Sequence, residues 1–327
     1  MTDLFQQSNS RLDAAIAETA SAISAGSLTK KSLFDTMTHM HGEGSAGGSW
    51  SQRDAFDLLE AGLSVHLSKA FSDVTRSAIS DITATIQQLP THTVRSEDQI
   101  RYQQFSTPAD LAALAIIMAQ PRTSDIVLEP SAGHGSMVAM LPPVKALHLN
   151  ELDAKRRTKL ARLFPDAQIT GVDGAMLTSL LDETIRPSLV LMNPPFSRSQ
   201  GRGVDEHAAV RHLRSALARL TPGGRLVAVM PDWFTTSAKL MKIYNDTLAN
   251  CTVQTSCRLD KCYQKQGTSV AVRLYVIDKV PGNIRPSVLA RDTVGELIAK
   301  ILVTKRCETR TAPQAQPVVA KPKAATL

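Results

Sequence analysis

The sequence predicts an α/β fold in which helices cover both faces of a mostly parallel sheet. From residue 100 onward, short apolar runs alternate with helix-like segments, which is the pattern of parallel strands joined by crossover helices. Two late runs are separated only by DKCYQKQG, which is too short for a crossover helix. These two runs must pair antiparallel, so we expect a seven-stranded sheet with one late antiparallel strand.

Apolar runs supply these strands, and a helix-like segment follows four of the first five. In chain order the runs are DIVLE, KALHLN, AQIT, PSLVLMN, GRLVAVM, CTVQTSCRL and TSVAVRLYVID. The predicted organisation is a helical accessory region at 1–98, the α/β domain at 99–281, a short C-terminal helix at 282–304 and a basic, disordered tail at 305–327.

Residues 1–98 are predicted to be helical because their apolar residues follow helical spacing, as Leu12 and Ile16 do. One helix is expected to begin at Ser51, whose hydroxyl can cap it, with Asp54 three residues later. This region contains no chemical motif, and we interpret it as an accessory or dimerisation segment.

Composition and charge restrict the partners of the protein. The chain has 327 residues and a net charge of +7, and its 43% hydrophobic content is enough for a sizeable core. The segment from Lys305 holds five basic residues and one acid, so it contributes +4 of the total. The rest is only mildly basic, which permits nucleic acid as a partner without requiring it.

Other patterns exclude some classes of protein. The four cysteines lack the paired spacing of a zinc site and are expected to be free thiols, and no metal-ligand cluster is visible. The first residues are polar, and the longest apolar run, LAALAIIMA, is too short to span a bilayer. We therefore expect a soluble, cytoplasmic protein without a membrane partner and without a metal.

The stretch DIVLEPSAGHGSM predicts a strand, a glycine loop and then a helix. Gly133 and Gly135 let the backbone approach a ligand closely. Glu151 ends the next strand, 18 residues after Gly133, where a carboxylate can accept both hydroxyls of a ribose. Asp173 follows the third strand and can accept from an adenine amino group, although it can also be a simple turn residue before Gly174.

Two classes of cofactor fit this constellation. Dinucleotides usually need a third glycine, in the pattern G-x-G-x-x-G, and Val138 stands at that position. S-adenosylmethionine has no phosphates and needs only close backbone approach and an acid for the ribose. The sequence therefore favours S-adenosylmethionine.

The stretch LVLMNPPF places Asn193 at the carboxyl end of the fourth strand, on the same sheet edge as the glycine loop. Consecutive prolines stiffen the backbone and leave carbonyls without a local N–H partner. The amide oxygen of Asn193 and the carbonyl of Pro194 can then accept both N–H bonds of one planar amino group, and Phe196 can stack on a flat heterocycle. The alternative is a proline-stiffened turn with a packed aromatic side chain.

Five motifs in this order, FSTP, EPSAGHG, NELD, GVDG and NPPF, resemble those of the amino-methyltransferase family, specifically DNA adenine-N6 methyltransferases. The resemblance covers residues from about 102 to 280, and the chain is also similar to methyltransferases carried by phages and plasmids. It implies a Rossmann-like class I methyltransferase fold for 99–281, with S-adenosylmethionine as the cofactor.

The resemblance also implies roles for individual residues. Thr107, the expected N-cap of a helix with Pro108 in its first turn, would lie near the methionine end of the cofactor. The full cofactor set is Thr107, Pro108, Glu129, Pro130, Ala132, Gly133, Gly135, Glu151, Asp173 and Asn193. The catalytic set is Asn193, Pro194, Pro195 and Phe196, and the substrate set is Phe196, Arg198, Arg202 and Trp233.

The chain departs from the family at His134, which we expect to point to solvent, and at Ser197, where glycine is frequent. It also lacks an obvious domain for reading a DNA sequence, so we expect either loose sequence specificity or readout by a partner subunit or by the helical region.

The implied activity is methyl transfer from S-adenosylmethionine to the N6 amine of adenine in DNA, with the base flipped out of the duplex. This would suit restriction-modification systems and phage or plasmid proteins. One alternative is an N-methyltransferase of a ribosomal RNA base or a protein glutamine. Another is a non-catalytic module of an anti-restriction complex.

Overall fold

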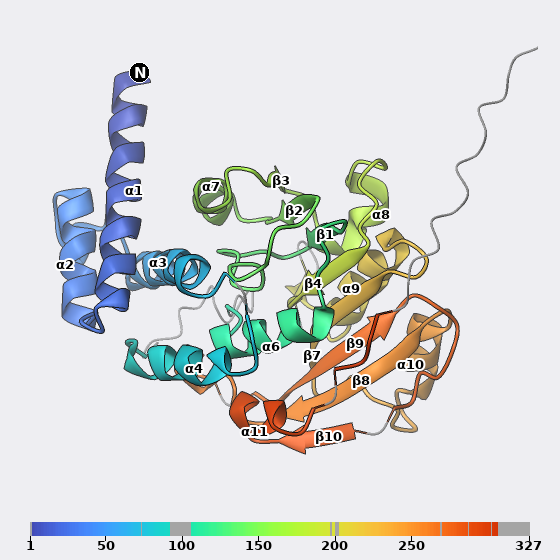
Figure 1. The fold of residues 1–327 in the computed structure, drawn as a ribbon. Coiled ribbons are helices and arrows are strands. Elements are labelled where there is room, and N and C mark those ends of the chain that lie inside the picture. The colour runs from blue at the N-terminus through green and yellow to red at the C-terminus, as the bar shows by residue number, and fades with distance from the viewer. Residues whose placement is uncertain are drawn as a thin grey trace, which may run out of the picture.

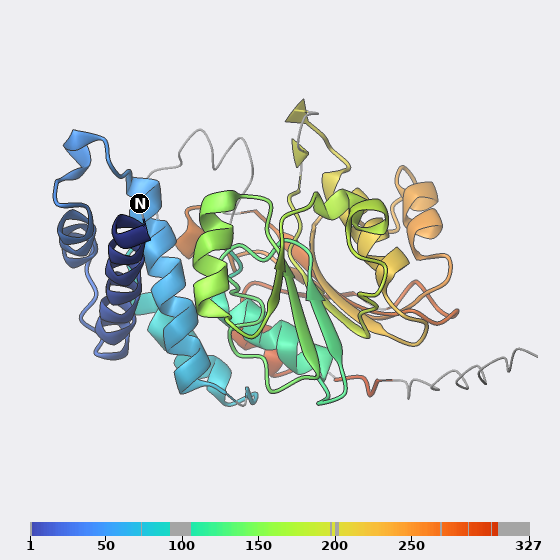
Figure 2. The same cartoon turned by 90° about the horizontal axis from the view of Figure 1, so that it is seen from above.

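A computed structural model describes residues 2–306 except 73, 92–105, 197, 200–202, 269, 287 and 302. Figures 1 and 2 show a central sheet covered by helices, with a group of N-terminal helices at one end of the molecule. Among the described residues, no helix has both the length and the apolar character needed to cross a bilayer.

The main sheet confirms the predicted fold class. Its strand order is β10-β8-β9-β7-β4-β1-β2-β3, and only β9 runs antiparallel to its neighbours. The seven predicted strands are all present. Their bounds, with the added β10, are β1 (Ile126–Glu129), β2 (Ala146–Asn150), β3 (Gln168–Thr170), β4 (Leu189–Met192), β7 (Arg225–Pro231), β8 (Thr252–Leu259), β9 (Val272–Asp278) and β10 (Val288–Arg291).

Both faces of this sheet are buried, which explains why β4 is a continuous apolar run. Side chains alternate along a strand, so Leu189 and Leu191 enter one core while Val190 and Met192 enter the other. The first core also contains residues of α4 (Ala78–Gln88), α6 (Ala109–Ala119), α7 (Ala154–Leu163) and α11 (Val294–Ile298). The second contains residues of α8 (Leu177–Leu180), α9 (Ala208–Arg219) and α10 (Met241–Leu248).

The N-terminal region is helical, as predicted, and has a small core of its own. Ser51 caps a helix and forms a capping box with Asp54, which confirms that expectation. A further helix of this region spans 30–41, and Thr29 caps it. The three helices of this core are α1 (Thr2–Ser24), α2 (Lys30–His41) and α3 (Gln52–Ala70).

This region lies against helix α7 of the α/β domain (Figure 1 and Figure 2). Arg162 of α7 forms an ion pair with Asp13 of α1 at 2.7 Å, and Arg156 of α7 pairs with Asp57 of α3 at 3.2 Å. Leu163 of α7 also packs on the small N-terminal core. The helices at 1–98 are therefore docked on the α/β domain through both charge and apolar contact.

The C-terminal segment differs from its prediction. Residues 282–304 contain strand β10 before the short helix α11, and β10 pairs parallel with β8. The sequence analysis missed this strand because it is an edge strand of only 4 residues.

The first residues of the predicted disordered tail also belong to the fold. Arg306 is 4% exposed, and its guanidinium contacts Asp125 with a shortest distance of 2.5 Å. The backbone carbonyl of Thr304 accepts a hydrogen bond from Arg225, which itself pairs with Asp278. The tail prediction for 307–327 lies outside the described residues.

This contact predicts a large effect of Arg306→Met on stability. The change leaves the carboxylate of Asp125, which is 3% exposed, without its buried cation, and such a loss costs about 3–5 kcal/mol. Chemical denaturation measures the free energy of unfolding. Lys300→Met, at an exposed position, is the matched control. Equal stability of both variants would contradict a structural role for Arg306.

Candidate active site at the carboxyl edge of the sheet

The predicted site residues lie at one edge of the sheet because the strands that carry them are parallel. β1 pairs with both β2 and β4, so the carboxyl ends of the three strands meet at the same edge. Glu129 ends β1, Glu151 follows β2 and Asn193 follows β4. This edge is where open α/β sheets bind ligands.

Asn150, which the sequence analysis did not single out, joins the ends of three strands. Its amide nitrogen donates to the carbonyls of Pro130, after β1, at 2.9 Å and of Val172, after β3, at 2.8 Å. Its oxygen accepts from the backbone N–H of Val172 and the hydroxyl of Thr170. The side chain is 1% exposed, so these bonds fix the spacing of β1, β2 and β3 at the site.

Glu151 holds the glycine loop. One carboxylate oxygen accepts from the N–H of Gly133 at 2.8 Å, and the other accepts from the N–H of Asp153 at 2.8 Å. Each carboxylate oxygen has two lone pairs, so both can accept a further hydrogen bond from a ligand hydroxyl. The predicted juxtaposition of this acid with the glycine loop is present.

The predicted helix after the glycine loop is absent, and the chain forms a series of turns. Val138 donates its N–H to the carbonyl of Gly135, and Leu141 donates to that of Val138, both with the three-residue spacing of turns. Gly135 has φ +78°, a left-handed conformation that interrupts a right-handed helix, and the prolines at 142–143 prevent its recovery.

The two glycines of the loop serve different purposes. A Cβ on Gly135 would lie 2.2 Å from the ring of Phe164, so only glycine fits there. Gly133 also has a positive φ, of +55°, but among the described residues no atom lies within 4 Å of its missing Cβ. The space beside Gly133 can therefore accept a ligand, while Gly135 packs against the protein.

His134 does not point to solvent, as the sequence analysis expected. Its side chain is 0% exposed, and Nδ1 lies 2.9 Å from a carboxylate oxygen of Glu60 on helix α3. The backbone carbonyl of His134 accepts from the hydroxyl of Ser64, also on α3, at 3.0 Å. The expectation failed because both partners lie far away in the sequence.

Glu129 is 1% exposed, and burial, followed by the nearby charge of Glu151, raises the pKa of its carboxyl well above the usual value. Within the described part of the chain, its Oε2 atom has no hydrogen-bond partner. A buried polar atom without a partner at a sheet edge suits contact with a polar ligand.

Asp173 acts as a turn residue, the alternative left open above. Its Oδ1 atom accepts from the N–H of Ala175 at 2.9 Å and caps the short helix η2 (Gly174–Met176). Nε2 of His212 lies 3.9 Å away, and burial lowers the pKa of this histidine to about 4, so it is neutral at pH 7. Asp173 stands at the end of β3, beside the other edge residues.

Thr107 is not the N-cap of helix α6, because the helix begins one residue later and Pro108 occupies that position. The hydroxyl of Thr107 instead accepts a hydrogen bond from Nδ2 of Asn193 at 2.9 Å. Nδ2 also donates to the hydroxyl of Tyr263 at 3.0 Å. Both amide N–H groups are thus engaged, so Oδ1 is the atom with which Asn193 can accept a hydrogen bond from a ligand.

Tyr263 is the second residue that the sequence analysis missed. It lies between β8 and β9 and is 2% exposed. Burial raises the pKa of its hydroxyl well above the usual value, so the group stays neutral. An aromatic residue in a short hairpin loop could have marked Tyr263 as a candidate. Its contact with Asn193, 70 residues away, could not be predicted from the sequence.

The remaining predicted residues surround Asn193 to different extents. Pro194 is buried, and Pro195 and Phe196 are half-buried, with Phe196 packed against both cores. Trp233 is half-buried, and its ring lies edge-on to His207 with a centroid distance of 5.7 Å. Arg198 lies in β5 (Arg198–Ser199), which pairs with β6 (Gly203–Val204), and Arg202 lies outside the described residues.

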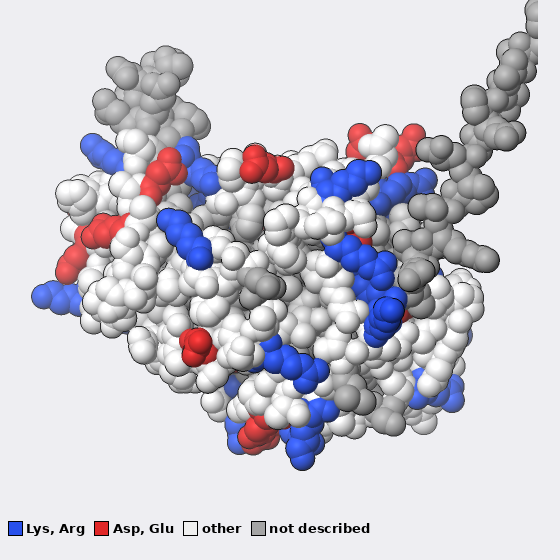
Figure 3. Space-filling view, in the orientation of Figure 1, with Lys and Arg blue, Asp and Glu red and all other residues white. Residues whose placement is uncertain are grey.

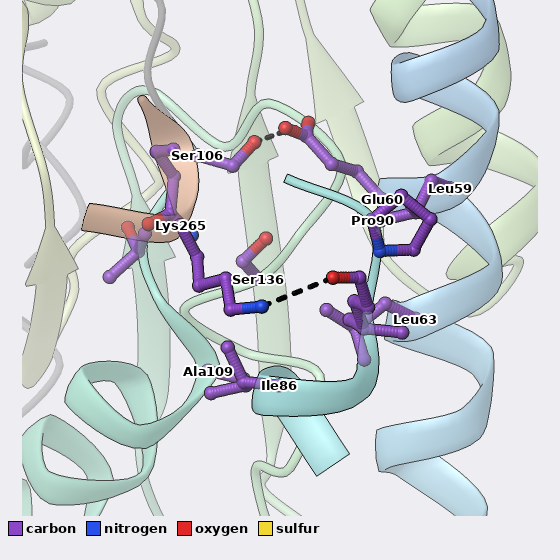
Figure 4. A pocket seen from close by; sticks show the side chains of 12 residues that line it. Leu59, Glu60, Leu63, Ile86, Pro90, Ser106, Ala109, Ser136 and Lys265 are labelled. Atoms are coloured by element: carbon purple, nitrogen blue, oxygen red, sulfur yellow. Dashed lines mark hydrogen bonds between the residues drawn. The ribbon is translucent and has the colours of Figure 1, made fainter. Parts of the chain in front are cut away.

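A pocket opens beside Thr107 (Figure 4). Leu59, Leu63, Ile86, Leu89 and Ala109 form its apolar wall. Its polar groups are Glu60, Ser106, Thr107, Ser136, Lys265 and Gln266. Helices of the N-terminal region thus share this pocket with the sheet domain.

The glycine loop yields a stability prediction. Gly135→Ala should lower the free energy of unfolding by about 3 kcal/mol, because it adds a clash with Phe164 to an unfavourable left-handed conformation. Gly133→Ala should cost only about 1 kcal/mol, from conformation alone. Urea denaturation measures both. A larger loss for Gly133→Ala than for Gly135→Ala would contradict this division.

The chain can be compared with known protein families, sequences and structures. No protein-family model matches the chain. A segment of 78 residues is 38% identical to the ribosomal RNA large subunit methyltransferase G of Shewanella denitrificans, and it spans 24% of this chain and 19% of that protein.

Two solved structures match the chain at low identity. The M protein of the type I restriction enzyme EcoKI is 16% identical, with a TM-score of 0.48 over 86% of this chain and 71% of that chain. TrmN from Thermus thermophilus is 21% identical, with a TM-score of 0.41 over 54% of this chain and 51% of that chain. These identities are too low to transfer a substrate.

Proposed function

We propose that the protein is an S-adenosylmethionine-dependent methyltransferase that modifies a planar amino group, and that its substrate is the N6 amine of adenine in DNA. The observation that carries this proposal is the position of Asn193. Its amide nitrogen is held by two hydroxyls, at the same sheet edge as Glu151 and the glycine loop. We assign the methyltransferase domain to residues 99–281, with 1–98 docked on it.

The residues present fit S-adenosylmethionine. Space beside Gly133 admits a ligand, and the spare lone pairs of Glu151 suit the two hydroxyls of a ribose. The unpartnered Oε2 of Glu129 suits a polar group of the methionine end. Asp173 would take the adenine amino group with the lone pairs that remain after it caps η2. Thr107, Pro108, Pro130 and Ala132 would line the rest of this site.

The chain contributes positioning rather than a strong base. Bound S-adenosylmethionine supplies an electrophilic methyl group on its sulfonium. Oδ1 of Asn193 and the carbonyl of Pro194 would accept the two N–H bonds of the target amine and direct its lone pair towards that methyl. Alignment of this kind can lower the barrier by several kcal/mol, of the order of 7–11 kcal/mol in well-oriented systems.

A base in duplex DNA would have to leave the stack to reach this edge. Phe196 and Trp233 would form apolar walls for it, and Pro195 would stiffen the backbone directly before Phe196. Arg198 and Arg202 would contact phosphates. In the view of Figure 3, Lys and Arg side chains gather over α8 and α9, which supports an anionic partner.

An RNA base is the second candidate substrate, because the similar segment of the Shewanella protein comes from a ribosomal RNA methyltransferase. RNA presents the same planar exocyclic amines, so the site chemistry alone favours neither polymer. Sequence reading in DNA would require the N-terminal helices or a partner subunit, since direct readout needs an element that enters a groove.

The substrate is tested by incubating the protein with radiolabelled S-adenosylmethionine and unmethylated DNA, ribosomal RNA or total protein in parallel. We expect label in DNA, recovered as N6-methyladenine after digestion to nucleosides. Label in RNA alone would show that RNA and not DNA is the substrate. It would not contradict the proposed chemistry of the site. Absence of transfer to all three, in a protein that binds the cofactor, would favour a non-catalytic module.

Asn193→Ala should reduce methyl transfer by at least a hundredfold and leave S-adenosylmethionine affinity within about threefold, because the amide acts on the target amine. Single-turnover assays measure the first quantity and isothermal titration calorimetry the second. Loss of cofactor binding together with activity would contradict the separation of the two roles.

Tyr263→Phe should lower kcat by about tenfold, because one N–H of Asn193 loses its acceptor and the amide loses its fixed orientation; such a hydrogen bond is worth about 1–2 kcal/mol. Cofactor affinity should not change. Tyr244→Phe is a matched control, since the Tyr244 hydroxyl bonds the carbonyl of Ile284 instead. Equal kcat values for Tyr263→Phe and wild type would contradict the orienting role.

A further inference from the structure

A buried polar cluster connects helix α3 of the N-terminal region with the glycine loop. Asp57, Glu60 and His134 are each less than a tenth exposed, at 6%, 9% and 0%. Asp57 and Glu60 are three residues apart on α3 and therefore lie on one face of that helix. His134 stands between the two glycines of the loop, and its ring faces Glu60 on α3.

Glu60 contacts both segments assigned above to the cofactor. Its Oε2 atom lies 2.9 Å from Nδ1 of His134, in the glycine loop, and it also accepts from the hydroxyl of Ser106. Ser106 directly precedes Thr107 and Pro108. One carboxylate from α3 therefore bridges two chain segments that are 28 residues apart in the sequence.

A second contact from the same helix strengthens the attachment. Ser64, one turn after Glu60, donates to the backbone carbonyl of His134 at 3.0 Å and is 3% exposed. Both the side chain and the backbone of His134 are therefore held by α3. Hydrogen bonds of this kind are strongest when buried and charge-assisted, as the bonds to Glu60 are.

The charges of the cluster are balanced by the protein. Asp57 lies 3.2 Å from Arg156 and 3.8 Å from Lys159, both on α7, the helix that follows Glu151. The ligand atoms of Asp57, Glu60 and His134 are within 4.8 Å of one another, which is close enough for a metal ion. Two adjacent cations make a further positive charge unfavourable, so the cluster is better explained as an ionic network than as a metal site.

The N-terminal region also borders the pocket beside Thr107. Figure 4 shows Glu60 and Ser106 joined at the rim of this pocket, with Lys265 on the facing side. Lys265 donates to the backbone carbonyl of Gln87, at the end of α4, at 2.8 Å. Helices α3 and α4 therefore form one side of a pocket whose other side is Thr107 and Ser136.

We propose that the N-terminal region is an integral part of the cofactor site, and that Glu60 is the positioning residue that holds the glycine loop and the Ser106–Thr107–Pro108 segment in register for S-adenosylmethionine. The inference rests on the proposed function. Glu60 acts through His134 and Ser106, and its loss loosens both walls of the site while the sheet stays intact.

The test compares Glu60→Gln with Glu18→Gln, which changes an exposed carboxylate on α1 in the same way. We expect Glu60→Gln to raise the Kd and KM for S-adenosylmethionine at least tenfold, with a smaller effect on kcat at saturation. Ser64→Ala should raise KM less, and Glu18→Gln should match wild type. An unchanged KM in Glu60→Gln, or a fall in kcat and Tm without a change in KM, would overturn the proposal.

Hydrogen exchange on the ligand-free protein supplies a readout that does not depend on activity. Amides of 130–136 should exchange about tenfold faster in Glu60→Gln than in wild type or Glu18→Gln, while β4 and β7 keep their protection. Unchanged exchange in that segment would overturn the proposal.

Failure of the proposed function has a different signature. Wild-type protein that does not bind S-adenosylmethionine by calorimetry would refute the function before any variant is compared. Wild-type binding that Glu60→Gln retains in full would refute only the positioning role.

Discussion

The site depends on the hydrogen bonds of one buried amide. Asn150 uses both its N–H groups and its oxygen to join the backbone after β1 to that after β3, while its own strand, β2, lies between them. Parallel strands diverge into separate loops beyond their last ladder bond, and the Asn150 side chain adds to the backbone bonds from Ala132 to Asn150 and from Glu151 to Thr170 that hold these ends together. The next residue, Glu151, then meets Gly133 at a defined distance.

Hydrogen bonds to a side-chain amide also fix the geometry on the substrate side of the site. Asn193 is anchored by its nitrogen, so that its oxygen has one orientation, and the anchors come from the start of α6 and from the β8–β9 hairpin. A third contact, from Glu60 to His134, extends the arrangement to the N-terminal helices. Buried hydrogen bonds make a site rigid, and each of these bonds links chain segments that are distant in sequence.

The sequence predicted whatever depends on local pattern. Apolar runs such as LVLM located the strands, the short DKCYQKQG connection required the antiparallel pair, and parallel topology placed Glu151 and Asn193 on one edge. The predictions were wrong where a contact with a distant residue determines the burial or the role of a side chain. The burial of His134, the use of Thr107 as an acceptor rather than a cap, and the buried start of the C-terminal tail each depend on a side chain more than 70 residues away.

The central claim is that cofactor and target amine meet side by side at the edge that Asn150 holds together. A crystal structure with S-adenosylhomocysteine tests it most directly. The account predicts the ribose hydroxyls within about 3 Å of the Glu151 carboxylate and the sulfur facing Asn193. A ligand bound away from this edge, or oriented with its sulfur turned from Asn193, would contradict it.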